Sequence, residues 1–93
     1  MFLVTTNGHC GKINVGLAIR GGKIRSTSGK FVMRPIHIAG TVSSSGQARM
    51  NGVAGPREAQ GTGRFKKSKG SGKWNGTGPS GVCSGTWFAV RAV

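Results

Sequence analysis

The sequence predicts an all-β protein, built as a small antiparallel up-and-down barrel or a strongly curved meander of about seven or eight strands. Its apolar segments are short, rich in β-branched residues and alternate with a period of two, while no segment shows helical periodicity. Glycine supplies 18 of the 93 residues and separates these segments at short intervals. This length fits one β domain covering residues 1–93.

Alternation and turn residues place the individual elements. The segment 12–19 alternates most regularly, with Ile13, Val15, Leu17 and Ile19 on one face. The pair Gly21-Gly22 within 20–23 predicts a tight hairpin turn, because glycine adopts positive φ without steric cost. A loop is expected at 26–29, a strand edge or break at Pro35, turns at 43–46, 54–57, 67–70 and 75–81, and a last strand from Val82 to Arg91.

A glycine precedes an aromatic residue by two positions at four places in the chain. Residues i and i+2 of a strand share a face, so each glycine and its aromatic partner should face the barrel interior. A glycine leaves a gap for a ring from a neighbouring strand and lets the sheet curve. We therefore expect an aromatic interior of Phe31, Phe65, Trp74 and Trp87, with the intervening Lys30, Arg64, Lys73 and Thr86 pointing outward.

The chain is strongly basic: it has 14 Lys and Arg residues and a single acidic residue, Glu58, which gives a net charge of +13. Such a surface attracts polyanions: nucleic acid, acidic polysaccharide, lipopolysaccharide or an anionic membrane surface. A charge that serves solubility alone is the alternative. Expected binding residues form a first basic cluster of Arg64, Lys66, Lys67, Lys69 and Lys73, and a second basic cluster of Lys12, Arg20, Lys23 and Arg25.

Catalysis and metal binding find no support in the sequence. Paired carboxylates cannot occur with Glu58 as the sole acid. The side chains of the adjacent residues His9 and Cys10 would point to opposite faces of a strand. The histidines and cysteines lack the close spacing of metal ligands. We therefore expect a protein that is not an enzyme and has no metal or other cofactor.

The two cysteines, Cys10 and Cys83, fall at the end of the first strand and near the start of the last. These strands are neighbours in a closed barrel, so a Cys10–Cys83 disulfide would link the first strand to the last. Two buried free thiols are the alternative. A disulfide favours a periplasmic or secreted location. No apolar run is long enough to span a membrane, and the chain begins directly on a strand, so we expect its leader to be absent from this sequence.

A set of short motifs runs along the chain: Cys10, Gly22-Lys-Ile24, the segment from Phe31 to Gly40-Thr-Val42, Ala59-Gln-Gly-Thr-Gly-Arg64, Ser71-Gly-Lys-Trp74 and the terminal Cys83-Ser-Gly-Thr-Trp-Phe-Ala-Val-Arg91. Together these motifs resemble a family of small secreted alphaproteobacterial proteins, common in rhizobial relatives, whose function is uncharacterised. The resemblance covers nearly the whole chain. It implies export, a disulfide and an all-β domain, and it transfers no functional residue.

The sequence is compatible with three functions. The leading one is a non-catalytic, exported module that binds polyanions through its basic outer face, without reading bases, since Phe65 and Trp74 are expected inside. The alternative is a carrier of a small apolar ligand held in the barrel among the four interior aromatics. The second alternative is a cytoplasmic RNA-binding protein, which requires free thiols.

Overall fold

The computed structural model describes residues 2–8, 12–31, 34–78 and 81–91, without the side chains of Lys30 and Phe31. These residues form nine strands and no helix. The strands are β1 (Phe2–Gly8), β2 (Ile13–Arg20), β3 (Lys23–Phe31), β4 (Arg34–Pro35), β5 (His37–Val42), β6 (Gln47–Ala54), β7 (Arg57–Lys66), β8 (Lys69–Gly78) and β9 (Gly81–Arg91).

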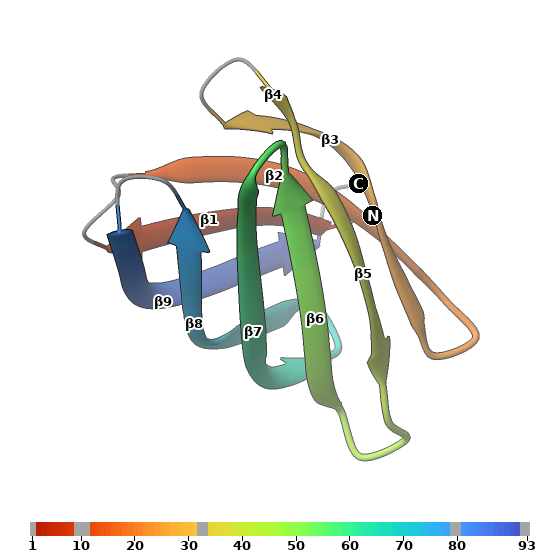
Figure 1. The fold of residues 1–93 in the computed structure, drawn as a ribbon. Helices are drawn as coiled ribbons and strands as arrows, with labels where there is room; N and C mark the ends of the chain where they lie inside the picture. Colours follow the sequence, from red (N-terminus) through yellow and green to blue (C-terminus); the bar gives the residue numbers. More distant parts are fainter. Residues whose placement is uncertain (1, 9–11, 32–33, 79–80, 92–93) are drawn as a thin grey trace.

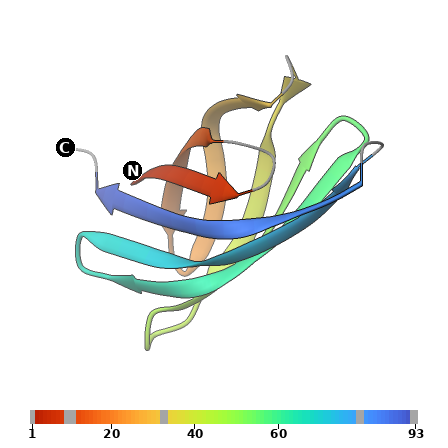
Figure 2. The same ribbon diagram turned by 90° about the vertical axis from the view of Figure 1, so that its left-hand side faces the viewer.

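Eight of these strands close into an antiparallel barrel, as predicted. The hydrogen-bonded order is β2-β1-β9-β8-β7-β6-β5-β3, and the additional pairing of β2 with β3 closes the ring. β4 pairs only with the end of β3, beside the break that Pro35 was expected to mark. Figure 1 shows β5, β6 and β7 crossing β1 and β2, with β9 alongside β1, and Figure 2 shows β7, β8 and β9 as one strongly curved wall.

The tight turn between β2 and β3 is confirmed. Gly21 and Gly22 have φ angles of 55° and 77°, the two positive values that a two-residue hairpin of this type needs. The turns at 43–46 and 54–57 also lie where the sequence placed them, and Gly46 and Gly55 again have positive φ. Local glycine chemistry therefore identified these turns correctly.

The loop expected at 26–29 is wrong, because β3 continues through it. The register shifts there: Leu17 pairs with Ser26 but Gly16 pairs with Ser28, which leaves Thr27 as an extra residue of the kind found in a β-bulge. The hydroxyl of Ser26 accepts a hydrogen bond from the Ile38 amide at 2.9 Å and donates one to the Ile36 carbonyl at 3.1 Å. This side chain thus links β3 to β5 where direct strand pairing ends.

The turns expected at 67–70 and 75–81 are too long. β8 already begins at Lys69, opposite Lys66, and runs to Gly78, with Ala59 facing Gly76 and Glu58 facing Thr77. Residues 75–77 resemble a turn by composition, yet they pair with β7 on one side and β9 on the other, and Gly78 pairs with Gly81 of β9. Pairing within the closed barrel therefore overrides local turn preference.

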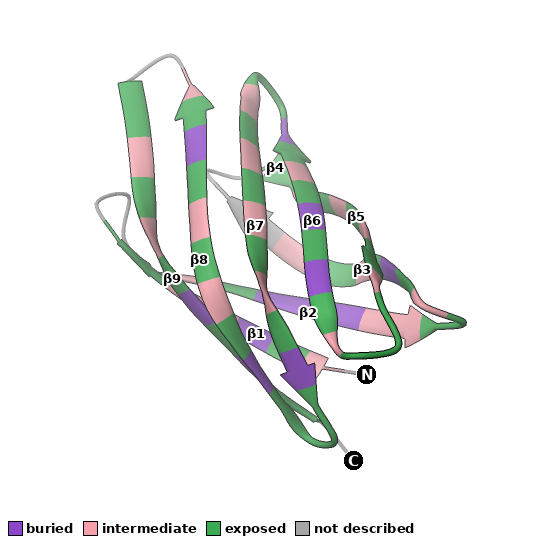
Figure 3. Cartoon of the chain, turned by 90° about the horizontal axis from the view of Figure 1, so that it is seen from below, coloured by how far each residue is buried: buried purple, intermediate pink, exposed green. Residues whose placement is uncertain are grey.

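The apolar core fills the end of the barrel near the β2–β3 and β7–β8 turns. Leu17 and Ile24 are the largest fully buried side chains. Phe65 packs edge-on against Phe2, with ring centroids 5.0 Å apart, and in a tilted arrangement against Trp87 at 5.4 Å. Exposed and less exposed residues alternate along β6, β7 and β8, as Figure 3 shows. The inward position predicted for Phe65 on β7 is thereby confirmed.

Candidate functional site

Glycines make room for aromatic rings inside the barrel, as the sequence predicted. Trp87 on β9 pairs with Gly72 on β8, which pairs with Gly63 on β7. The indole extends across this row, since a Cβ atom built on Gly63 would lie 2.5 Å from Trp87 Cζ2. A Cβ on Gly70 would likewise lie 2.6 Å from the Phe65 ring. These glycines are packing positions at the inner face of the sheet.

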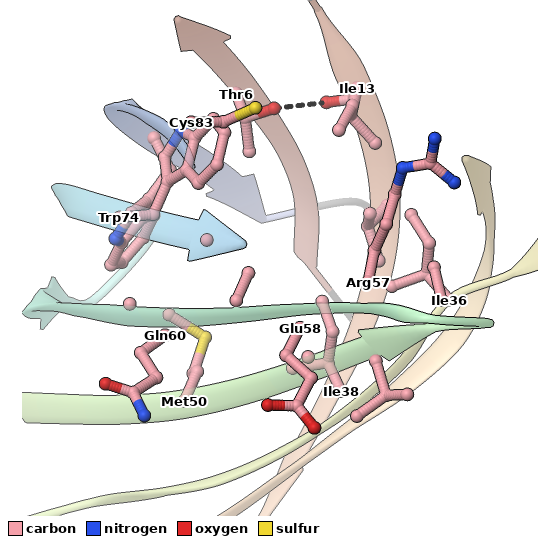
Figure 4. A pocket seen from close by; sticks show the side chains of 18 of the residues that line it. Thr6, Ile13, Ile36, Ile38, Met50, Arg57, Glu58, Gln60, Trp74 and Cys83 are labelled. Atoms are coloured by element: carbon pink, nitrogen blue, oxygen red, sulfur yellow. Dashed lines mark hydrogen bonds between the residues drawn. The ribbon is translucent and has the colours of Figure 1, made fainter. Parts of the chain in front are cut away.

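An apolar cavity of about 140 Å³ lies toward the other end of the barrel and adjoins the core cluster, which supplies Val4, Val15, Leu17, Met50 and Trp87 to its wall. It opens among the ends of β6 and β8 and the starts of β7 and β9. Figure 4 shows Trp74 on one side of this hollow and Ile36, Ile38 and Arg57 on the other. Its apolar side chains come from most of the barrel wall: Val4, Ile13, Val15, Leu17, Ile36, Ile38, Met50, Val53, Ala54, Ala59, Trp74 and Trp87. We call this space the mouth cavity.

The aromatic residues do not all surround the mouth cavity, whereas the sequence placed them together around one interior space. Trp74 and Trp87 line the mouth cavity, and Phe65 does not. Trp87 also belongs to the core cluster, where its ring packs against that of Phe65. The side chain of Phe31 lies outside the described residues. The Nε1 atom of Trp74 is buried and has no hydrogen-bond partner among the described residues.

One arginine, Arg57, lies at the rim of the mouth cavity, and a second, Arg34, lies by the β6–β7 turn; the sequence analysis did not single them out. Arg57 is half-buried, lines the cavity and packs over Gly78, where a Cβ atom would lie 2.8 Å from Arg57 Cγ. Arg34 packs over Gly55 in the β6–β7 turn, where a Cβ would lie 2.5 Å from its Cδ. Their positions at the strand ends become visible only once the barrel register is known.

The first basic cluster lies on the outer face of the β7–β8 hairpin, as expected. All five side chains are exposed. Lys66 and Lys69 face each other directly beside the turn that contains Lys67, while Arg64 pairs with Ser71 and Lys73 with Thr62. Glu58 is also exposed but lies near the start of β7, at the far end of that strand from Lys66. The hairpin tip is thus uniformly cationic.

The structure does not bring the second basic cluster to the first. Lys12, Arg20, Lys23 and Arg25 are exposed on or beside β2 and β3. β2 is separated from β8 by β1 and β9, and β3 is separated from β7 by β5 and β6. The two clusters therefore occupy opposite walls of the barrel, as the separate β2–β3 and β7–β8 hairpins in Figure 1 show.

Exposed apolar side chains adjoin the first basic cluster, a feature that the sequence analysis missed. Leu3, Phe88 and Val90 are 51%, 46% and 42% exposed on the outer face of β1 and β9. Val90 pairs with Leu3 on one side and Lys69 on the other, and Phe88 pairs with Ser71. Phe88 and Val90 alternate along β9 with the inward-facing Trp87 and Ala89. This alternation was the sequence signal that placed them on the outer face.

Cys83 is half-buried on the inner face of β9 and is not a free thiol, being bonded in a disulfide. The expected partner, Cys10, lies outside the described residues together with His9, so the Cys10–Cys83 pair stays a prediction. His37 is exposed on β5. No cluster of three or more His, Cys, Asp or Glu occurs in the described part of the chain, and no helix there could cross a membrane.

Fold and surface define a small, strongly basic, eight-stranded antiparallel barrel with an apolar cavity at one end and a cationic hairpin at the other. The chain matches no protein-family model and no curated protein. The resemblance to small secreted alphaproteobacterial proteins therefore stays an expectation.

Proposed function

We propose that this protein is a non-catalytic, exported module that binds polyanions through the first basic cluster. The observation that carries the proposal is the arrangement of Arg64, Lys66, Lys67, Lys69 and Lys73 on the outer face of one hairpin. Such a group of cations attracts phosphate, sulfate and carboxylate polymers and releases their counterions on binding.

Local repulsion makes this hairpin a better polyanion site than a solvated charged surface would be. Lys66 and Lys69 are directly opposite each other, and like charges in that position destabilise a strand pair. An anionic group placed between them relieves the repulsion and adds charge-assisted hydrogen bonds. Binding is therefore coupled to a gain in the stability of the hairpin.

The neighbouring apolar patch favours an amphiphilic polyanion, such as lipopolysaccharide, over a purely polar one. Val90 lies beside Lys69, and Phe88 lies two strand positions before it on the same outer face. Lipopolysaccharide offers phosphate groups next to acyl chains, so it could contact both the cations and the exposed side chains. Acidic polysaccharide and nucleic acid would use the cations alone.

Binding of a heparin-like polysaccharide, single-stranded DNA and lipopolysaccharide across a salt series tests the proposal. For both polar polymers we expect log affinity to fall linearly with log salt, with a slope of roughly −3.5 if five cations each contribute about 0.7. The variant Lys66→Glu/Lys67→Glu/Lys69→Glu should lose this binding. Lipopolysaccharide should retain more affinity at high salt, because apolar contacts are not screened.

The second basic cluster supplies the matched control. The variant Arg20→Glu/Lys23→Glu/Arg25→Glu has the same net charge as the triple lysine variant but alters the opposite wall. It should bind nearly as well as the parent protein. Equal losses in the two variants would show that net charge alone drives binding, and unchanged affinity in the lysine variant would refute the assignment.

A further inference from the structure

The mouth cavity has the size and chemistry of a ligand site. Its lining side chains are overwhelmingly apolar, and it is open to solvent between the strand ends. Among the side chains labelled in Figure 4, Thr6 has the one hydroxyl group. This hydroxyl donates a long hydrogen bond of 3.5 Å to the Ile13 carbonyl oxygen. An apolar group that enters a cavity of this kind removes apolar surface from water, which favours binding.

The volume limits what this space can hold. Apolar cavities of roughly 150 Å³ bind single-ring molecules such as benzene. The mouth cavity, at about 140 Å³, therefore suits one ring and is too small for a long acyl chain. Trp74 and Trp87 lie on its wall, and aromatic side chains favour stacked or edge-on contact with such a ring.

The rim adds positive charge to this apolar space. Arg57 lies on the inner side of β7 and crosses Gly78, while Arg34 packs over Gly55. Glu58 is exposed, and in Figure 4 its carboxylate extends away from the hollow. A guanidinium group matches a carboxylate in shape and offers two parallel hydrogen bonds.

We propose that the mouth cavity binds a single-ring carboxylate, with the ring against Trp74 and Trp87 and the carboxylate at Arg57. This site is separate from the polyanion surface, which lies around the turn at the other end of β7 and β8. It gives the barrel a small-molecule ligand in addition to its polymeric partner.

Titration of the folded protein with phenylacetate, followed by tryptophan fluorescence, tests the site. The chain has two tryptophans, and both line the cavity. We expect a saturable change with phenylacetate, and an affinity weaker by roughly tenfold or more for the neutral analogue phenylacetamide and for Arg57→Gln. Palmitate should not compete. No saturable change, or equal affinity for acid and amide, would overturn the proposal.

A cavity-filling variant separates this site from unspecific binding. A Cβ atom on Gly52 would meet Ile38 Cγ1 at 3.4 Å, an ordinary contact, so Gly52→Leu can extend into the cavity without a backbone collision. This variant should lose phenylacetate binding but keep polyanion binding. The variant Lys66→Glu/Lys67→Glu/Lys69→Glu should show the reverse. Undiminished phenylacetate binding in a folded Gly52→Leu protein would refute the cavity as its site.

Discussion

The indole Nε1 of Trp87 donates a hydrogen bond to the backbone carbonyl oxygen of Thr62, at 3.1 Å, across the intervening strand β8. The contact ties β9 to β7 through the barrel interior, and it can form because Gly63 and Gly72 present no side chain there. One polar contact thus depends on two glycines of two neighbouring strands.

Replacing Trp87 by Phe should lower the free energy of unfolding by about 2 kcal/mol, because a partly buried hydrogen bond and part of the ring volume are both lost. Urea unfolding monitored by circular dichroism measures this loss. Trp74→Phe is the matched control, since Trp74 Nε1 has no partner in the described part of the chain and its removal leaves no acceptor there unpaired. A loss as large for Trp74→Phe as for Trp87→Phe would contradict the role of this hydrogen bond.

A side chain at Gly63 should be tolerated far less than one on the opposite face of the same strand. A Cβ there would collide with the Ser71 carbonyl and lie 2.5 Å from Trp87 Cζ2. Gly63→Val should therefore lower the unfolding free energy by more than about 3 kcal/mol or prevent folding. The exposed neighbour Thr62→Val should change it by no more than about 0.5 kcal/mol. Similar thermal midpoints for both variants would refute the packing role.

Much of this interior was predictable from sequence because it depends on local rules. A period of two fixes which residues share a face, so the inward positions of Phe65, Trp74 and Trp87 followed directly. Two consecutive glycines fixed the turn at Gly21-Gly22, because few other residues adopt positive φ there.

The errors arose where partners distant in sequence decide the local structure. The stretch Ser26-Thr-Ser-Gly29 looks like a loop, but β2 pairs with it on one side, and the Ser26 hydroxyl bridges to Ile36 and Ile38. The mouth cavity and the rim position of Arg57 depend on barrel closure and register. The separation of the two basic clusters follows from strand order, which charge spacing along the chain does not reveal.

The Cys10–Cys83 disulfide can be tested directly. Gly8 pairs with Gly85, and an unbroken continuation of that register would set position 10 opposite Cys83. Directly opposite positions of antiparallel strands are spaced suitably for a disulfide. Intact mass without reductant should be lower than the reduced mass by two hydrogens.

Loss of that bond should also cost stability. Reduction, or the variant Cys83→Ser, should lower the unfolding free energy by roughly 4 kcal/mol, because the bond encloses most of the chain. Cys10→Ser should have the same effect as Cys83→Ser. Two thiols that react with a maleimide in the unreduced, unfolded protein would contradict the pairing.

The cationic hairpin should be more stable when its charge is reduced. Lys66 and Lys69 are directly opposite, so Lys69→Glu replaces a repulsive pair by an attractive one and should raise the unfolding free energy by roughly 0.2–1 kcal/mol at low salt. High salt should abolish this gain, since the pair is exposed. Lys69→Gln, which removes the repulsion without adding attraction, should have a stability between those of the parent protein and Lys69→Glu.

Both variants should bind heparin-like polysaccharide less tightly than the parent, so the hairpin would gain stability as it loses affinity. Urea midpoints at low and high salt measure the first effect, and a Lys69→Glu protein that is less stable than its parent at low salt would contradict it.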